Sequence, residues 1–401
     1  MELLGKSKDE LRVYCEALGE PAYRGGQIYR ALYVERKLET GEMTNLPAAF
    51  RARLENEATI TMPEVKQRFA SRDGSVRYLF GLGKEKSRDT EGTENTEQKE
   101  ERQRSGGKNT AGLRAKPTQV EAVYMPSEGR RTICISTQAG CAVDCQFCLT
   151  AQLGLIRNLT AGEILGQVLA ALNEDEGREV SPEANADVPR AAPSSGPKTP
   201  EKEQMQTNVV LMGQGEPLLN FENVMGALRI LLDPEGMGLS PKHVTLSTSG
   251  IVPGIERLGK EELRPKLAIS LNASNDEERN KLMPINRKYP LAKLMEACRN
   301  YPLRNWEHLT FEYVMLGGLN DADEDARRVV RLLAPLKRVK VNLIPWNPGD
   351  LPYCESNEER IEAFRRILSE KGVPAFVRYS RGRDVMAACG QLALKEGTKD
   401  Q

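Results

Sequence analysis

Short apolar runs that alternate with amphipathic stretches constrain the fold of this chain more than any other feature of its sequence. The runs that resemble strands lie at 132–136, 209–212, 244–247, 267–271, 309–314, 339–344 and 375–379. Stretches with helical spacing of apolar residues separate most of them, for example 161–170 and 358–370. Strands that alternate with helices indicate a parallel sheet, open or closed into a barrel, so the sequence predicts the α/β class.

Polar or glycine-rich motifs come directly after five of these runs. They begin at Gln138, Gly213, Ser247, Ser270 and Pro345. Because the carboxyl ends of parallel strands meet at one edge, ligands of such sheets bind there. The five motifs therefore predict one binding site on that edge.

The amino-terminal part of the chain has a different character. Residues 1–72 open with a capping-box pattern from Ser7 to Glu10 and continue with amphipathic spacing, which predicts a small, self-contained helical domain. Residues 73–126 hold two strand-like runs and are expected to form a β-hairpin linker. Its strands are interrupted at 84–117 by a segment rich in charged and small residues.

Two insertions are expected to be disordered, since neither has enough apolar surface to offset the entropy of ordering. The first is 84–117, and the second is 173–206, which is rich in proline and acidic residues. The second interrupts a core domain expected over 127–384. Residues 385–401 complete the chain as a carboxyl-terminal segment.

Composition limits the classes of function. The chain has no apolar run of about 18 residues and no apolar stretch behind a basic amino terminus, so we expect a cytoplasmic protein outside the membrane. Its 57 basic residues balance 57 acidic ones, so any contact with nucleic acid must come from local patches.

Three closely spaced cysteines carry the strongest chemical signal. Cys141, Cys145 and Cys148 form a C-x3-C-x2-C pattern in the loop after a predicted strand. Three thiolates can bind three irons of a cubane cluster and leave the fourth iron open to a cofactor. The alternative is a zinc site, but structural zinc sites have four ligands, usually in paired C-x2–4-C units. The pattern favours an iron–sulfur cluster.

The neighbouring motifs supply groups that suit a polar cofactor. In the motif from Met212 to Pro217, the glycines allow close approach of backbone to a ligand and Glu216 can accept hydrogen bonds from an amino group. Such a motif alone is more often an ordinary tight turn. Hydroxyl and amide groups suited to ribose and carboxylate come from Ser247, Ser270, Asn272 and Asn347.

Together these residues resemble the RlmN family, bacterial radical S-adenosylmethionine (SAM) enzymes that methylate carbon 2 of adenine in 23S rRNA and tRNA. The resemblance extends over most of the chain, and its most specific segments are 21–29, 136–148, 157–164, 212–220, 246–250, 283–286, 342–348 and 387–392. It implies a partial (β/α)6 TIM-like barrel as the radical SAM core and an amino-terminal accessory domain that binds RNA.

The resemblance also implies the cofactor sites. Cys141, Cys145 and Cys148 match the ligands of a [4Fe–4S] cluster. The SAM contacts of the family match Gly215, Glu216, Ser247, Ser270, Leu271, Asn272 and Asn347. Two SAM molecules per turnover, an external electron donor and a monomeric enzyme are expected.

A two-cysteine mechanism follows from the same resemblance. Cys389 matches the residue that accepts a methyl group from one SAM; a radical made from a second SAM then activates that methyl group for addition to carbon 2. Cys134 matches the cysteine that resolves the adduct through a transient disulfide with Cys389, and Glu121 matches the proton acceptor. Without the resemblance, both cysteines would be interpreted as structural thiols and Glu121 as a solvated strand residue.

Two alternatives remain open at this point. A related enzyme that methylates carbon 8 of adenine would share almost all of these motifs. A non-catalytic iron–sulfur or zinc module that binds RNA would use the clustered cysteines but give Cys389 no role.

Overall fold

The computed structural model describes residues 1–83, 118–178 and 205–392. The insertion expected at 84–117 lies outside them. The sequence predicts the second insertion over 173–206, but helix α6 (Ala161–Arg178) continues to Arg178 and strand β7 (Gln206–Leu211) begins at Gln206. Only 179–204 of that segment lies outside the described residues, because its first residues extend the amphipathic helix before them.

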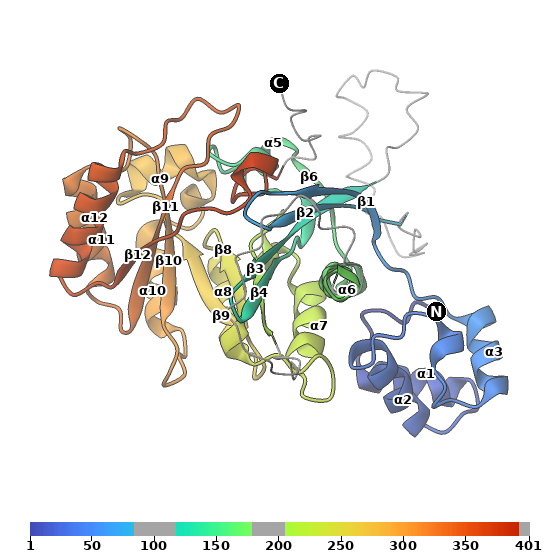
Figure 1. Cartoon of the computed structure of the whole chain (residues 1–401). Helices are drawn as coiled ribbons and strands as arrows, with labels where there is room; N and C mark the ends of the chain where they lie inside the picture. The colour runs from blue at the N-terminus through green and yellow to red at the C-terminus, as the bar shows by residue number, and fades with distance from the viewer. Residues whose placement is uncertain (84–117, 179–204, 393–401) are drawn as a thin grey trace, which may run out of the picture.

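A ten-stranded sheet forms the centre of the molecule, in the order β1-β2-β3-β4-β7-β8-β9-β10-β11-β12 (Figure 1). Seven neighbouring strands run parallel: β4 (Arg130–Cys134), β7, β8 (Val244–Thr248), β9 (Lys266–Ser270), β10 (Leu309–Met315), β11 (Val339–Pro345) and β12 (Ala375–Val377). Three antiparallel strands extend the sheet beyond β4: β1 (Glu64–Ala70), β2 (Val76–Gly81) and β3 (Gln119–Ser127).

Six crossovers, each containing a helix, connect the parallel strands. Their helices are α6, α7 (Phe221–Leu232), α8 (Val252–Leu258), α10 (Leu291–Asn300), α11 (Asp323–Leu333) and α12 (Glu358–Glu370). Helix α9 (Asp276–Leu282) precedes α10 in the fourth crossover. The α/β class predicted from the sequence is confirmed. Within the described residues the parallel strands form an open sheet that ends at β12.

The core explains the continuous apolar runs in the sequence. In β9 the side chains of Leu267, Ala268 and Ile269 are all buried, and β10 is buried along nearly its whole length. A parallel strand that is covered on both faces shows this pattern because neither face meets water. Ser270, at the end of β9, and Glu312, in the middle of β10, are therefore polar exceptions that need a reason.

The amino-terminal part is helical only as far as Glu57. Helices α1 (Lys8–Ala17), α2 (Tyr23–Tyr33) and α3 (Ala48–Glu57) pack together, and the capping box is present: Glu10 N donates to Ser7 Oγ (3.2 Å) and Ser7 N donates to Glu10 Oε2 (2.9 Å). Residues 64–70, which the sequence predicts within this helical domain, instead form the edge strand β1. Their short run has too few apolar residues for a helix face and pairs with β2.

The sequence predicts that the helical part is self-contained. In the structure it packs against the rest of the chain. Its buried side chains belong to the same apolar cluster as those of the sheet and of α6 and α7. Gly5 has a φ of +87°, and a Cβ there would lie 2.3 Å from the backbone nitrogen of Gly162 in α6. Glycine is required at this contact because two backbones meet directly.

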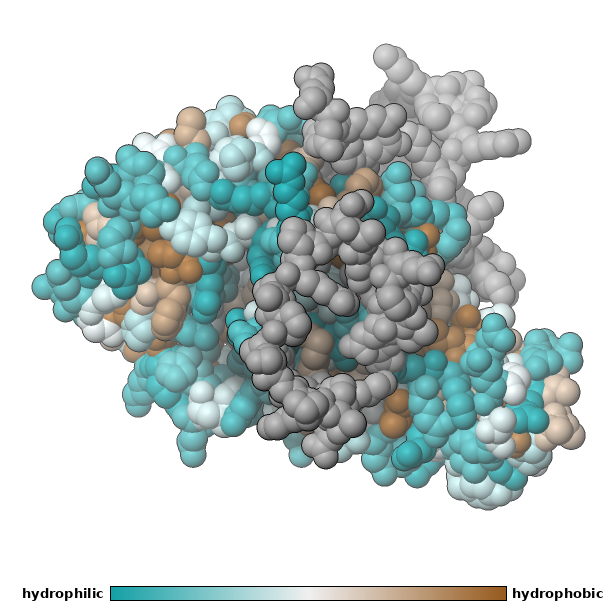
Figure 2. Space-filling view, in the orientation of Figure 1, coloured by the Kyte–Doolittle hydropathy of each residue, from teal (hydrophilic) through white to brown (hydrophobic). Residues whose placement is uncertain are grey.

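The visible surface is mostly hydrophilic, with apolar residues in small patches (Figure 2). Among the described residues, no helix has both the length and the apolar character to span a membrane.

Candidate active site

A cavity opens at the carboxyl ends of the parallel strands, where the sequence predicts the site. Its wall includes the three clustered cysteines, Cys141, Cys145 and Cys148, together with Cys389 from the other end of the chain. Six of the seven predicted SAM contacts also line it: Gly215, Glu216, Ser247, Ser270, Asn272 and Asn347. The remaining predicted residues, Leu271, Cys134 and Glu121, lie behind the wall.

The cysteine loop is fixed at both of its ends. It begins after β5 (Gln138–Gly140), which pairs with β6 (Leu155–Asn158), and Cys141 N donates to Gly154 O (3.0 Å). Gln146 N donates to Leu282 O at the end of α9 (2.9 Å), and the short helix α5 (Leu149–Gln152) starts directly after Cys148. Hydrogen bonds of its backbone amides therefore fix the conformation of the loop.

The donor set fits an iron–sulfur cluster. Burial raises the pKa of all three thiols, that of Cys141 to about 12; Glu216 and the neighbouring thiols add to this for Cys141 and Cys145. Three thiolates at this site therefore need cationic irons to stabilise them, and their protons leave when metal binds. Neither histidine of the chain lines the cavity, so a Cys3His zinc site is not available there.

The geometry of the thiols bears on the kind of metal centre. Among the described residues, no three His, Cys, Asp or Glu side chains are grouped so as to hold a single metal ion. In a cubane cluster each thiolate binds a different iron, so the sulfurs need not converge on one point.

The loop after β7 holds Glu216 in a fixed orientation. Its carboxylate accepts hydrogen bonds from Ser249 N and Ser249 Oγ (both 2.7 Å) and from Leu218 N (3.1 Å). Burial raises the pKa of Glu216 despite these bonds, which act in the opposite direction. Thr248 also bonds to this carboxylate, so the protein itself occupies most of its acceptor positions.

The two glycines of this motif serve the protein's own packing. A Cβ at Gly215, where φ is +100°, would lie 2.7 Å from Gln138 N, and one at Gly213 would lie 2.8 Å from the backbone of Ile135. They let the loop after β7 lie against the strand that leads into the cysteine loop. Both glycines also line the cavity, so the sequence interpretation, close approach of backbone to a ligand, stays a prediction.

The ends of β8 and β9 place two hydroxyls side by side. Ser247 Oγ and Ser270 Oγ are 3.5 Å apart on the cavity wall. The Leu271 side chain is fully buried, and its backbone N donates to Glu312 O (2.9 Å). A SAM contact from Leu271 would therefore involve its backbone carbonyl.

Asn272 takes a left-handed conformation (φ +56°), which asparagine tolerates better than most residues. Its Oδ1 accepts from Val314 N (2.9 Å). The fully buried Asn320 donates from Nδ2 to Asn272 O and to Val314 O (both 2.8 Å), and its Oδ1 accepts from Leu316 N (2.7 Å). Asn320 thus joins the loops after β9 and β10 by hydrogen bonds, and these contacts are called the Asn320 bracket. No sequence motif identified this residue.

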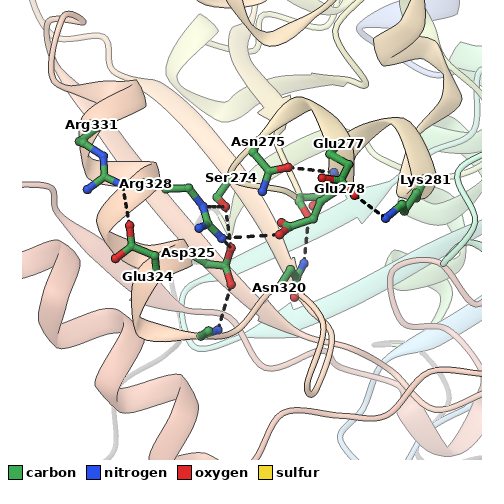
Figure 3. Close-up of polar contacts among 12 residues, drawn as sticks. Ser274, Asn275, Glu277, Glu278, Lys281, Asn320, Glu324, Asp325, Arg328 and Arg331 are labelled. Carbon is green, nitrogen blue, oxygen red and sulfur yellow. Dashed lines mark hydrogen bonds and ion pairs between the residues drawn. The ribbon is translucent and has the colours of Figure 1, made fainter.

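A second polar network lies outside this bracket (Figure 3). Ser274 Oγ donates to Asp325 Oδ1 (2.6 Å), and Arg328 donates from Nε to Ser274 Oγ (2.8 Å) and pairs with Asp325. Arg328 also lies 3.5 Å from Glu278 of α9. This network joins α9 to α11 and so holds the loop that carries Asn272.

Arg279 lies beneath the cavity floor and is fully buried. Its guanidinium donates to three strand-end carbonyls, Leu271 O (3.0 Å), Ser249 O (2.7 Å) and Ser270 O (3.0 Å), and to Asn286 Oδ1 (2.8 Å). Burial lowers the pKa of Arg279 to about 10, which the neighbouring Cys145 partly offsets. This residue, which was not predicted, fixes the ends of β8 and β9 together.

The carboxyl-terminal segment brings Cys389 to the site and packs against Cys134. Cys389 opens onto the cavity and is exposed to solvent. The protein atoms that surround its thiol, with Glu312 and Cys148 nearby, raise its pKa to about 11. Cys134, on β4, is buried in an apolar cluster with Ala387 and Leu392. Its pKa is raised by burial and by Cys389. Both thiols are free in this structure.

Two buried carboxylates lie near this end of the cavity. Glu121, on β3, is fully buried and pairs with Arg77, and Gln214 Nε2 donates to its Oε2 (3.3 Å). It does not line the cavity. Glu312, on β10, does line it; Asn342 Nδ2 donates to its Oε1 (2.9 Å), and burial raises its pKa.

Comparisons with known proteins agree with this site. Residues 201–331 match the Radical SAM superfamily. The crystal structure of a radical SAM methyltransferase from Sphaerobacter thermophilus is 37% identical, with a TM-score of 0.79, and the match covers 98% of this chain and 99% of that one. The fold and the site therefore define a radical SAM methyltransferase.

The relatives narrow the class further. Residues 1–60 match the ribosomal RNA large subunit methyltransferase N-terminal domain. A probable dual-specificity RNA methyltransferase RlmN of Koribacter versatilis is 46% identical over 95% of this chain and 98% of its own length. The dual-specificity RNA methyltransferase RlmN 2 of Myxococcus xanthus is 44% identical over 97% and 89%. This chain belongs to the RlmN family of SAM-dependent RNA methyltransferases.

Proposed function

We propose that this enzyme methylates carbon 2 of a specific adenine in 23S rRNA and in tRNA, with Cys389 as the methyl carrier. One observation carries the proposal: Cys389, which is about 240 residues from the cysteine loop in sequence, lines the same cavity as Cys141, Cys145 and Cys148. The relatives named dual-specificity RNA methyltransferases support RNA as the substrate class.

The cofactors are assigned to groups on the cavity wall. Cys141, Cys145 and Cys148 would hold a [4Fe–4S] cluster, and Glu216 would accept hydrogen bonds from the amino group of SAM. The proposed SAM site is completed by Gly215, Ser247, Ser270, Leu271, Asn272 and Asn347. When bound and reduced by an external electron donor, the cluster supplies the electron that cleaves SAM to a 5′-deoxyadenosyl radical.

The protein's own cysteines carry the carbon. The Cys389 sulfur takes a methyl group from a first SAM; its S–C bond forms as the sulfonium bond breaks, and the electron pair stays on the departing sulfur. The radical from a second SAM would remove a hydrogen atom from this methyl group, and the resulting methylene radical would add to carbon 2. The adduct would lose one electron, which the oxidised cluster can accept, and the carbon-2 proton would go to a carboxylate base. The Cys134 thiolate would then attack the Cys389 sulfur; the S–C bond breaks, the methylene carbon keeps the electron pair and takes a proton, and a disulfide and the methylated base remain. The apolar cluster of Cys134 with Ala387 and Leu392, which lie on either side of Cys389 in sequence, supports this pairing.

The resemblance assigns proton acceptance to Glu121. Because Glu121 pairs with Arg77 behind the wall, this role requires the loop that contains Gln214 to move. Glu312 faces the cavity without such a movement and is the second candidate for the role.

The remaining parts of the proposal concern partners. The amino-terminal helices would contact RNA, and the target adenine must leave its stack to enter the cavity. The proposed enzyme is monomeric. A cytoplasmic location is consistent with cysteines that pair only transiently, since the cytoplasm keeps thiols reduced.

Anaerobic reconstitution tests the function directly. The protein with iron, sulfide, methyl-labelled SAM and dithionite should release 5′-deoxyadenosine and label both 23S rRNA and tRNA. Mass spectrometry of digested RNA should locate the methyl group on carbon 2 of adenine. A methyl group on carbon 8, or RNA binding without any 5′-deoxyadenosine, would overturn the proposal.

A further inference from the structure

The helix that follows the cysteine loop is capped by the other end of the chain. Helix α5 starts at Leu149, and the residue before it, Cys148, provides no side-chain cap. Instead, Leu149 N donates to Gly390 O (2.8 Å). The carboxyl-terminal segment thus satisfies one of the amides that a helix start leaves without an intrahelical partner.

A side chain of the same helix makes a second bond to this segment. Thr150 Oγ1 donates to Leu392 O (2.6 Å), and Thr150 is only 4% exposed. The two bonds come from consecutive residues of α5 and reach Gly390 and Leu392 of the segment. Cys389 directly precedes Gly390 and lies in the turn that the bond from Gln391 N to Ala388 O closes.

The opposite side of the segment is held by the loop after β11. Asn347 Nδ2 donates to Cys389 O (3.1 Å), and Gln391 Nε2 donates to Pro348 O (2.7 Å). The segment therefore lies between two supports. Only the support on α5 is continuous in sequence with the cysteine loop, since Thr150 is two residues beyond Cys148.

We propose that Thr150 is a positioning residue, which clasps the carboxyl-terminal segment to the cysteine loop and so keeps the Cys389 sulfur at the cavity. The inference rests on the proposed role of Cys389 as methyl carrier. The clasp makes the position of the carrier depend on the loop that would hold the cluster, so that the two reacting centres move together. Thr150 also lines the cavity beside Cys148, but its role in this inference is to position the segment that carries Cys389.

The loss of the Thr150 hydrogen bond should have a measurable effect on the position of the carboxyl-terminal segment. One buried hydrogen bond changes the ratio of docked to released segment by roughly fivefold. Thr150→Val removes the hydroxyl at nearly constant volume, and Thr150→Ser keeps the hydroxyl. Thr44→Val, at an exposed threonine in the amino-terminal part, is the matched control.

Two measurements report whether the carboxyl-terminal segment is docked. The first is the rate at which iodoacetamide alkylates Cys389 in cofactor-free protein, measured by mass spectrometry of its peptide. The second is the amount of labelled methyl on Cys389 after incubation of reconstituted protein with methyl-labelled SAM. For Thr150→Val we expect alkylation to rise by up to roughly fivefold. Methyl incorporation should fall by a smaller factor, because most of the segment stays docked. Thr150→Ser and Thr44→Val should match the wild type in both measurements.

The outcomes separate this inference from the function on which it rests. Wild-type values for Thr150→Val in both readouts would overturn the clasp, as would a Thr150→Ser variant that behaves like Thr150→Val. A wild-type protein that acquires no methyl label on Cys389 would instead overturn the proposed function, whatever the Thr150 variants do.

Discussion

At the scale of single residues, two buried carboxylates are candidates for one proton transfer. A base must be within hydrogen-bond reach of the proton that it removes. Glu312 lies on the cavity wall, held by Asn342, whereas Glu121 is paired with Arg77 behind the wall. The positions favour Glu312 in this structure, and the family resemblance favours Glu121.

Amide substitutions at both positions distinguish these two roles. If the structure shows the working arrangement, Glu312→Gln should lower the rate of RNA methylation by about 100-fold or more, and Glu121→Gln should have a smaller effect. Single-turnover methylation of RNA by protein that already carries a methyl group on Cys389 isolates the relevant step. A larger loss for Glu121→Gln would show that the loop moves and that Glu121 is the base.

Residues also differ in how far the sequence could reveal them. The spacing of Cys141, Cys145 and Cys148 indicates a metal site because all three ligands of the metal centre lie close together in one loop. Nothing local marks Cys389 or Cys134, since their meeting depends on the path of the whole chain; only the family resemblance identified them. Glu312 does have a local signal in the sequence, a carboxylate within a mostly apolar strand.

At the scale of elements, the loops after β9 and β10 form one unit. Asn320 bonds to the backbone of both, and the network of Ser274, Asp325 and Arg328 holds the outer side (Figure 3). Such a bracket could not be predicted, because a single asparagine in a loop usually indicates a turn. Its consequence is that the conformation of Asn272 is set by a residue 48 positions away.

Removal of the bracket should therefore affect both folding and cofactor binding. Asn320→Ala leaves two buried carbonyls and one amide without this partner, so the free energy of unfolding should fall by about 2 kcal/mol. The affinity for SAM should also fall, because Asn272 is no longer fixed. Urea unfolding and equilibrium dialysis with labelled SAM measure the two effects, and the exposed Asn300→Ala is the control. Lost stability with unchanged affinity would remove Asn272 from the SAM site.

At the scale of the whole molecule, the carboxyl-terminal segment links the two ends of an open sheet. After β12, the last strand, the chain returns to the turn between β1 and β2, as Figure 1 shows. Ser71 Oγ donates to Asp384 Oδ1 (2.6 Å), and Gly382 N donates to Asp73 Oδ2 (3.0 Å). This return brings Cys389 to the cavity and Ala387 to Cys134.

The buried thiols make the stability of cofactor-free protein depend on pH. Burial raises the pKa of Cys15 to about 11 and that of Cys298 to about 12, against 9.0 when exposed. Their contribution is fully present below pH 9 and is lost as the pH rises towards these values, because the unfolded chain ionises first. The free energy of unfolding should fall between pH 9 and 11, by up to about 1.4 kcal/mol per pH unit for each such thiol.

Urea unfolding at several pH values above 8 measures this slope. Cys298→Ala should be less stable than the wild type at every pH, since it leaves a cavity, but its slope should be smaller by one thiol. An identical slope in the variant would mean that Cys298 does not ionise differently in the two states.

The proposed mechanism requires that one cysteine carries the carbon and that a second cysteine releases the methylated base. Its most direct test is Cys134→Ala, incubated anaerobically with cluster components, SAM, reductant and RNA. Without the resolving thiol, the variant should accumulate RNA joined covalently to Cys389, which mass spectrometry of the linked peptide would show; Cys298→Ala should release methylated RNA as usual. Free, unmodified RNA from Cys134→Ala, or a crosslink at any other residue, would contradict the account.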